Sequence, residues 1–327
     1  MNIRSRSAIH EEARQSLDRA PYKNQIILLY TAVCCGLSLL ATLMSVFFSD
    51  RISGTGGLEN IGLRSILSTG QSVLPLVQTI VTACMGLGYH ISMLTITRGY
   101  EATPRTLFQG FRHFGPLLRV TLLQGFVYFG IAFAATYISS FLFLLSPFSA
   151  DFMELMEPIV SSMSVLDTSL ILEESTLMAA AETMIPMVWI MAGVFLLLFI
   201  PVYYGFRMVN FCLAEDPRKG ALAAMAKSRR LMRHNRIALF RLDLTLWWFY
   251  LGTLAVSVLC YGDVLLPLVG IALPWSNEVS FYVFYLTSMV VQLVLYYFAM
   301  NKVYAVYAVT YDVLQDALPG TDTPVQM

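Results

Sequence analysis

Seven Lys and Arg side chains gather in one short segment of the chain, and the chemistry they offer is the binding of anions. The segment reads DPRKGALAAMAKSRRLMRHNRIALF and covers residues 216–240. Arginine and lysine hold phosphate groups through charge-assisted hydrogen bonds, and arginine makes two parallel bonds at once. A passive signal that sets membrane orientation is the alternative. The segment therefore predicts a surface that binds anionic lipid or a protein partner through Lys227, Arg229, Arg230, Arg233 and Arg236.

A second set of polar side chains lies within apolar runs and is a candidate path for a small solute or a proton. An ionisable group among apolar residues is energetically costly, so it marks a functional candidate. A structural alternative exists for each: amides join helices by hydrogen bonds, His90 is a bonded interior residue, and Asp243 pairs with an arginine. The candidate path consists of Gln78, His90, Gln124, Gln292 and Asp243.

The remaining patterns indicate neither an enzyme nor a metal site. The acidic pairs at residues 154 and 157 and at 173 and 174 lack the loop spacing of a cation site. The five cysteines form no Cys-x-x-Cys motif and no cluster with histidine. No nucleotide-binding, zinc-hydrolase or serine-hydrolase motif is present. We therefore expect no catalytic residues, no metal and no cofactor, in a protein that is not an enzyme.

The composition places these residues on membrane-spanning helices. The 327 residues are 57% hydrophobic and 13% charged, with a mean hydropathy of +0.65, whereas soluble domains carry about 25% charged residues. A spanning helix needs about 20 apolar residues. We expect a basic helix at residues 1–24, one transmembrane domain at 25–318, and a disordered tail at 319–327. The six predicted spans cover residues 25–48, 72–97, 117–148, 184–211, 239–261 and 281–309.

One further apolar segment, at residues 264–275, is too short to cross a bilayer. Pro267, Gly270 and Pro274 interrupt it. We interpret it as a re-entrant or interfacial piece between the fifth and sixth spans. A seventh crossing is the alternative, and it would place the C-terminus on the opposite side of the membrane.

The charges are distributed unequally between the two sides of such a bundle. With six crossings, the segments on the side of the termini carry 19 Lys and Arg residues, and those on the other side carry 2. Basic loops stay cytoplasmic, so both termini are predicted to be cytoplasmic in a plasma membrane. Residues 149–183 hold seven Asp or Glu and no Lys or Arg, which predicts an acidic extracytoplasmic cap. Because the basic residues flank membrane segments, no nucleic-acid partner is expected.

Two basic segments are typical of short amphipathic helices at the inner headgroup level. In residues 103–119 the apolar side chains Leu107, Phe108, Phe111 and Phe114 recur at helical spacing. In the second segment Asp216 is the predicted N-cap and Pro217 the first helical position. Its predicted apolar stripe, part of which is expected to enter the acyl chains, consists of Leu222, Met225, Ser228, Leu231 and Met232.

Aromatic residues at the end of the sixth span suggest an interfacial anchor. Tyr304, Tyr307 and Tyr311 recur at helical spacing beside Lys302. Tyrosine and lysine are enriched at the membrane–water interface, because each combines an apolar body with a polar tip. We therefore expect these side chains to lie at the headgroups. The alternative is an aromatic cage for a cation.

Several motifs together resemble a bacterial membrane family known as domain of unknown function 975. They are a basic N-terminal helix, Gly88-Tyr89, Arg98-Gly99, Leu107-Phe108-x-Gly110-Phe111, Asp216-Pro217 and, most specifically, Leu239-Phe240-x-Leu242-Asp243-Leu244. The chain departs from the family pattern at Asn235, where a Gly-Asn pair is usual, and in its long acidic segment. The resemblance implies a multi-helix integral membrane protein of unassigned role, and it contributes no catalytic residues.

These observations predict an all-α integral membrane fold. It is a six-transmembrane-helix bundle with short amphipathic helices on the cytoplasmic face and an acidic extracytoplasmic cap. The predicted function is that of a non-enzymatic plasma-membrane protein whose basic cytoplasmic face engages anionic lipid or a membrane or cytosolic protein partner. The alternative is a small-solute transporter or permease component with a polar path between its helices.

Overall fold

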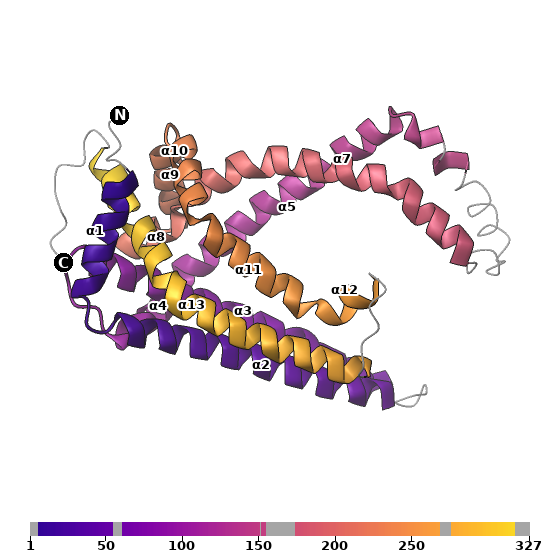
Figure 1. Cartoon of the computed structure of the whole chain (residues 1–327), viewed down its shortest axis with the longest axis horizontal. Coiled ribbons are helices and arrows are strands. Elements are labelled where there is room, and N and C mark those ends of the chain that lie inside the picture. Colours follow the sequence, from indigo (N-terminus) through magenta and orange to yellow (C-terminus); the bar gives the residue numbers. More distant parts are fainter. Residues whose placement is uncertain (1–5, 55–60, 151, 155–173, 269–275, 318–327) are drawn as a thin grey trace. The chain divides into compact units, whose positions relative to one another are not determined.

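The chain is helical in every regular element of a computed structural model that describes residues 6–54, 61–150, 152–154, 174–268 and 276–317 (Figure 1). Within these ranges, six helical segments are long and apolar enough to cross a membrane, which confirms the expected all-α class with six such helices. The segments are Lys23–Ser49, Leu67–Thr97, Phe114–Leu144, Ile185–Glu215, Arg236–Cys260 and Val279–Asp316.

The labelled helices follow one another closely along the chain. In order, they are α1 (Arg6–Arg19), α2 (Lys23–Gly54), α3 (Ile61–Thr97), η2 (Pro104–Phe108), α4 (Gln109–Arg112), α5 (Phe114–Leu144), α7 (Glu174–Phe206), α8 (Val209–Glu215), η3 (Pro217–Lys219), α9 (Ala221–Met232), α10 (Arg236–Asp243), η4 (Leu244–Leu246), α11 (Trp247–Cys260), α12 (Gly262–Leu268) and α13 (Asn277–Asp316). The elements marked η are 3-10 turns.

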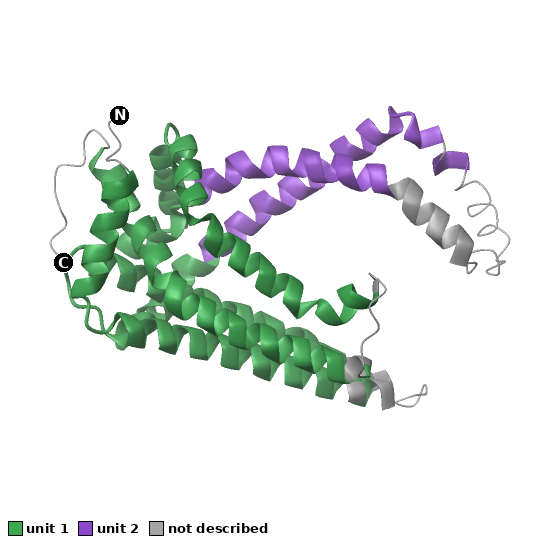
Figure 2. Ribbon diagram, in the orientation of Figure 1, with its two compact units in different colours: residues 1–118, 207–327 green, residues 119–206 purple. Residues whose placement is uncertain are grey.

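These helices divide into two compact units, shown in different colours in Figure 2. Unit 1 comprises Met1–Leu118 and Arg207–Met327, and unit 2 comprises Arg119–Phe206. In unit 2 the helices α5 and α7 contact each other through Tyr128 and Phe199, whose ring centroids are 5.3 Å apart. Stacked rings of Phe195, Phe199 and Tyr203 continue along α7. The candidate functional sites lie in unit 1.

In unit 1 the helices α2, α3 and α13 run alongside one another, and α11 packs on α13 (Figure 1). Helix α13 begins after Ser276, whose side chain accepts a hydrogen bond from the backbone N–H of Val279. A serine at this position satisfies a donor that the first helical turn leaves open. Because α13 contacts three long helices, side chains along it reach most of the core of this unit.

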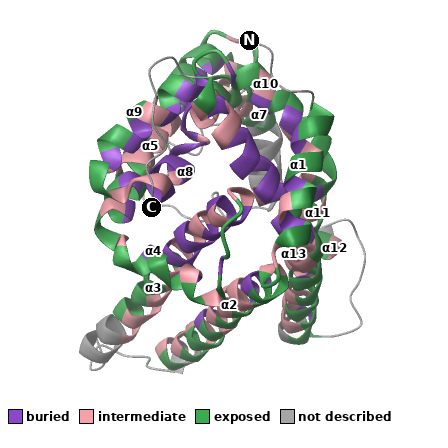
Figure 3. Ribbon diagram, turned by 90° about the vertical axis from the view of Figure 1, so that its left-hand side faces the viewer, coloured by how far each residue is buried: buried purple, intermediate pink, exposed green. Residues whose placement is uncertain are grey.

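Helix α1 covers one end of α13 with a single apolar face. Its buried residues are Ile9, Ala13 and Leu17, spaced four apart so that each falls one helical turn below the last. The remaining positions of α1 are mostly charged and exposed. Figure 3 shows the buried residues along α8 and the adjoining end of α3, and the exposed residues along the outward faces of α1 and α9.

Two glycines bring the segment after α3 into direct backbone contact with that helix. A Cβ atom on Gly88 would lie 1.8 Å from the carbonyl oxygen of Leu107, and one on Gly110 would lie 1.9 Å from that of Cys84. The predicted amphipathic helix over residues 103–119 is therefore wrong. The chain instead makes η2 and the single turn α4, because this approach needs a tight and irregular path. Leu107 is fully buried there.

The second basic segment also begins differently from the prediction. Asp216 caps the 3-10 turn η3, where its Oδ1 atom accepts a hydrogen bond from Arg218 N at 3.2 Å. Gly220, with φ at +83°, then redirects the chain, and α9 starts at Ala221. A positive φ is readily adopted only by glycine. The cap residue was thus identified correctly, but it caps the turn before the α-helix.

Three expectations fall wholly or partly on residues outside the described ranges. The tail at 319–327 lies outside them. Most of the acidic cap also lies outside, since residues 155–173 are not described. The predicted re-entrant segment at 264–275 is described only as far as residue 268, where α12 ends.

Candidate functional site

Four of the five predicted anion-binding residues lie together on the outer face of α9 and α10. The side chains of Arg229, Arg230, Arg233 and Arg236 are exposed. They occupy the last turn of α9, the turn that follows it, and the first residue of α10. We call these four residues the basic surface. Its guanidinium groups are available to ligands outside the protein.

An exposed apolar row continues directly from the basic surface along the fifth candidate span. Its members recur at alternating intervals of three and four residues, so they lie on one side of α10, η4 and α11. These residues, which we call the apolar stripe, are Ile237, Phe240, Leu244, Trp247, Leu251, Leu254 and Val258, and all are exposed. Such a row is the surface that a helix offers to hydrocarbon, and Trp247 belongs to a type enriched at the headgroup level.

Leu222, Met225 and Leu231, which were expected to enter the acyl chains together, do not share one exposed face of α9. Met225 and Leu231 are 8% and 1% exposed, because α9 packs them against the rest of unit 1. Leu222 is 71% exposed on the opposite side of α9. The expectation that these three side chains insert together is therefore wrong. The row of exposed apolar residues in this region is the apolar stripe instead.

Lys227 differs from the four arginines because it belongs to a charge cluster inside unit 1. Its Nζ atom donates to Glu215 Oε2 and lies 5.4 Å from the ring centroid of Tyr311. Tyr311 also donates to Glu215 Oε2, at 2.6 Å. Arg98 Nη2 lies 2.7 Å from Asp312 Oδ1 and 3.3 Å from Glu215 Oε1. Two cations and two carboxylates thus join α3, α8, α9 and α13.

Arg98 is the central cation of this cluster, and its environment favours the charged form. Burial opposes the charge, but hydrogen bonds to Asp312 and attraction by Asp312 and Glu215 outweigh it, so the pKa of Arg98 lies above its ordinary value. The cluster is internally neutral and includes Arg98, Lys227, Glu215 and Asp312. We assign it a structural role in holding the helix ends together.

A second polar cluster lies around Arg207. The Nη2 atom of this arginine donates to the hydroxyl oxygens of Tyr250 and Tyr307, at 2.7 and 3.0 Å. Tyr307 donates in turn to Asp243 Oδ1 at 2.6 Å, and its ring lies beneath the guanidinium at 4.7 Å. We call Arg207, Tyr250, Tyr307 and Asp243 the Arg207 network. It joins the start of α8, the end of α10, and the helices α11 and α13.

Two candidate spans depart from regular α-helix at this network. The fourth is interrupted between Phe206, where α7 ends, and Val209, where α8 begins. The fifth passes from α10 at Asp243 through the 3-10 turn η4 before α11 begins. In a spanning helix an interruption is tolerated where its backbone is buried in protein or lines a cavity. Both interruptions therefore mark the Arg207 network as a candidate site.

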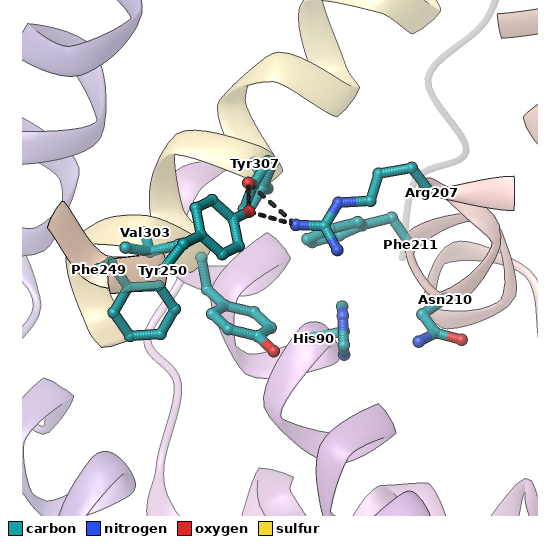
Figure 4. A pocket seen from close by; sticks show the side chains of 9 residues that line it. His90, Arg207, Asn210, Phe211, Phe249, Tyr250, Val303 and Tyr307 are labelled. Atoms are coloured by element: carbon teal, nitrogen blue, oxygen red, sulfur yellow. Dashed lines mark hydrogen bonds between the residues drawn. The ribbon is translucent and has the colours of Figure 1, made fainter. Parts of the chain in front are cut away.

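A cavity of about 210 Å³ adjoins the Arg207 network within unit 1 (Figure 4). Figure 4 shows the Arg207 guanidinium pointing at the two tyrosine hydroxyls above His90. The Nδ1 atom of His90 lies 2.7 Å from the carbonyl oxygen of Gly86, which can only accept a hydrogen bond. The lining residues are His90, Arg207, Asn210, Phe211, Phe249, Tyr250, Val303, Tyr304 and Tyr307.

The structure brings together only part of the predicted polar path. His90 lines the cavity, and Asp243 is linked to it through Tyr307. Gln78 and Gln292 are half-buried on α3 and α13 and are not among the lining residues. Gln124 belongs to unit 2.

The predicted tyrosine anchor is also wrong in part. Tyr307 and Tyr311 are 4% and 0% exposed, since they point into unit 1 toward Arg207 and Glu215. Arg207 itself was not singled out from the sequence. The available signal was a lone arginine at the inner end of an apolar run that also contains Pro201. Ionisable residues in such runs are uncommon, and they need partners.

Comparison with known proteins identifies the family. The sequence profile of a family described as Protein of unknown function (DUF975) matches residues 1–311. No curated protein and no solved structure matches the chain. The resemblance drawn from the sequence motifs is thus confirmed, and the chain belongs to the DUF975 family.

Proposed function

We propose that the protein is a non-enzymatic, multi-pass plasma-membrane protein that engages anionic lipid through the basic surface. The observation that supports this most strongly is the continuity of the basic surface with the apolar stripe. Arg233 and Arg236 stand directly before Ile237 and Phe240. A phospholipid has the same order of groups, with an anionic head followed by apolar tails. One lipid can therefore be held by its phosphate and by its acyl chains at once.

The proposal includes an orientation, with both termini and the basic surface in the cytoplasm. The 19 to 2 distribution of Lys and Arg supports it. The packing of α1 against α13 also supports it, since the described ends of the chain then belong to the same end of unit 1 (Figure 1). Anionic lipids of the cytoplasmic leaflet attract basic residues near the surface by about 1 kcal/mol each. Four neighbouring arginines then produce a marked lipid preference.

Lipid selection by the reconstituted full chain tests this proposal. Native mass spectrometry would compare bound phosphatidylglycerol with bound phosphatidylcholine, after reconstitution in nanodiscs that contain equal amounts of both. We expect the chain to retain phosphatidylglycerol preferentially. Changing Arg229, Arg230 and Arg233 to Gln should reduce that preference on the order of 100-fold, because three attractions of about 1 kcal/mol are lost.

A matched triple variant controls for the loss of charge alone. Arg6, Arg14 and Arg19 are exposed on α1, where Arg14 lies 3.9 Å from Asp18. Changing these three to Gln removes the same charge from a helix that also carries acidic residues. We expect the lipid preference of this control variant to stay near that of the unchanged chain. Equal preferences in all three proteins would overturn lipid binding by the basic surface, and a protein partner would then be its remaining ligand.

Small-solute transport is a second candidate, supported by the interruption of the fourth span beside the cavity. Interrupted helices form substrate sites in many transporters. The candidate is weaker, because only His90 of the five predicted path residues lines the cavity. Thiol labelling of Gln78→Cys and Gln292→Cys, in a background without the native cysteines, tests it. Transport requires water to reach both positions, so two unlabelled thiols in a folded chain contradict it.

A further inference from the structure

We propose that the cavity beside the Arg207 network is a binding site for a small aromatic carboxylate. Arg207 would hold the carboxylate group, and the surrounding rings would hold the flat apolar body. This inference is independent of lipid binding, since none of the four arginines of the basic surface lines the cavity. It also requires no movement of the ligand across the membrane.

Arg207 is positioned in advance for such a ligand. Its Nη2 atom donates to Tyr250 and Tyr307, and the face of its guanidinium lies 4.7 Å from the ring centroid of Tyr307. Tyr307 is held by its hydrogen bond to Asp243. These contacts restrict the rotation of a long side chain, so little additional order is lost when a ligand binds. The guanidinium would add to these bonds one charge-assisted hydrogen bond to a ligand carboxylate.

The charge of the cavity wall selects an anion. Among its nine lining residues, Arg207 carries the only permanent charge, and none of the nine is a carboxylate. Asp243 lies behind Tyr307 and is not among them. Aromatic faces alone would also attract a cation. The positive charge of the guanidinium opposes the binding of a cation.

The size and the shape of the cavity select a small, flat ligand. Its volume of about 210 Å³ is below the range of roughly 300–1,000 Å³ typical of sites for drug-sized molecules. Six of the nine lining side chains are rings. His90 packs edge-on against Phe211 and Tyr304, with centroid distances of 4.7 and 5.2 Å. A single aromatic ring can pack against such walls in the same way, so benzoate is a suitable probe.

Equilibrium binding of labelled benzoate to the full chain tests the inference. The chain would be placed in nanodiscs of phosphatidylcholine alone, so that no anionic lipid competes. Benzamide, the neutral analogue, measures partition into the bilayer and the contribution of the ring. We expect benzoate to bind about tenfold more tightly than benzamide, as one charge-assisted contact allows. Equal affinity for the two compounds, or no binding of benzoate, would overturn the proposal.

Variants locate the site. Arg207→Gln should abolish the preference for benzoate, whereas Arg241→Gln, an exposed change of the same kind on α10, should keep it. A benzoate preference that survives Arg207→Gln contradicts the proposed site. If Arg207→Gln does not fold, Val303→Leu provides the decisive variant, because it adds volume at the cavity wall. Benzoate affinity should then fall several-fold, and an unchanged affinity would place the ligand elsewhere.

The same experiment separates two sources of anion. A lipid phosphate held by Arg207 would be displaced by benzoate in nanodiscs that contain phosphatidylglycerol, and the apparent affinity for benzoate would fall there. The proposal predicts at most a few-fold lower apparent affinity in the anionic nanodiscs, the loss that repulsion of benzoate by the negative surface produces. A strong loss in anionic nanodiscs would assign the site to a headgroup and overturn the carboxylate ligand.

Discussion

At the scale of single residues, the polar groups of unit 1 occur in matched sets. Arg98 meets Asp312 and Glu215, and Tyr307 connects Arg207 with Asp243. A charge that is half-buried without a partner is strongly destabilising, whereas a charge within such a set is tolerated. The two sets differ in their surroundings. The cluster of Arg98, Lys227, Glu215 and Asp312 is internally neutral and joins helix ends, whereas the Arg207 network borders a cavity.

Arg98→Ala should destabilise the protein markedly. Glu215 and Asp312 would lose a shared cation at positions where their side chains are only 18% and 29% exposed. Leaving charged groups without their partner costs about 1–3 kcal/mol. Unfolding in detergent, followed by intrinsic fluorescence, measures the loss. Arg105→Ala, at an exposed position of η2, should change stability by less than about 0.5 kcal/mol. Similar effects of both changes would show that the cluster contributes nothing specific.

Residue spacing identified some of these groups but not their partners. His90 and Asp243 were predictable candidates, because ionisable side chains are uncommon in apolar runs. Tyr307 and Tyr311 recur one helical turn apart beside a lysine, and that pattern fits both an interfacial belt and a buried face. Only the packing of α13 shows that they point inward. Arg98, Glu215 and Asp312 come together from helix ends that lie far apart in the sequence.

At the scale of elements, α3 and the segment η2–α4 are in direct backbone contact. Gly88 lies against the backbone of Leu107, so that any side chain there would overlap a carbonyl oxygen. Backbone atoms cannot move aside as a flexible side chain can. This contact explains why the segment after α3 is not a regular amphipathic helix. It also positions the end of α3, from which Arg98 extends.

Gly88→Ala should separate α3 from the segment η2–α4. A Cβ atom at 1.8 Å from Leu107 O forces the backbone to shift, at a cost of about 3 kcal/mol or more. Gly86→Ala is the matched control on the same helix, because its nearest neighbour, Tyr30 Oη, would be 4.0 Å away. That control should be neutral or slightly stabilising. Thermal unfolding of both variants in one detergent measures the difference, and equal stability would contradict the close contact.

The long helices were predictable because length and hydropathy alone determine whether a segment is suited to cross a bilayer. The interruptions of the fourth and fifth spans were not predictable. The break after Phe206 has neither proline nor glycine at the two residues that form it, Arg207 and Met208. The passage from α10 through η4, at Leu244–Leu246, also contains neither proline nor glycine. Both breaks lie beside the tertiary hydrogen bonds around Tyr307, which a local pattern does not reveal.

At the scale of the whole molecule, the described helices have the composition of a chain that spans a membrane. Six apolar helices, a basic surface and the apolar stripe form a consistent set of features. Uneven charge favours one orientation, in which cationic residues face the leaflet richest in anionic lipid. In that orientation the basic surface lies on the same side of the membrane as the anionic headgroups of that leaflet. The lipid proposal depends on this arrangement, whereas the carboxylate site does not.

The most direct test is the location of the basic surface in living cells. The variant Arg233→Cys, made in a chain without its native cysteines, would be treated with a thiol reagent that cannot cross membranes. We predict labelling in inside-out membrane vesicles and none in intact cells. Labelling in intact cells would place the basic surface outside and contradict the account.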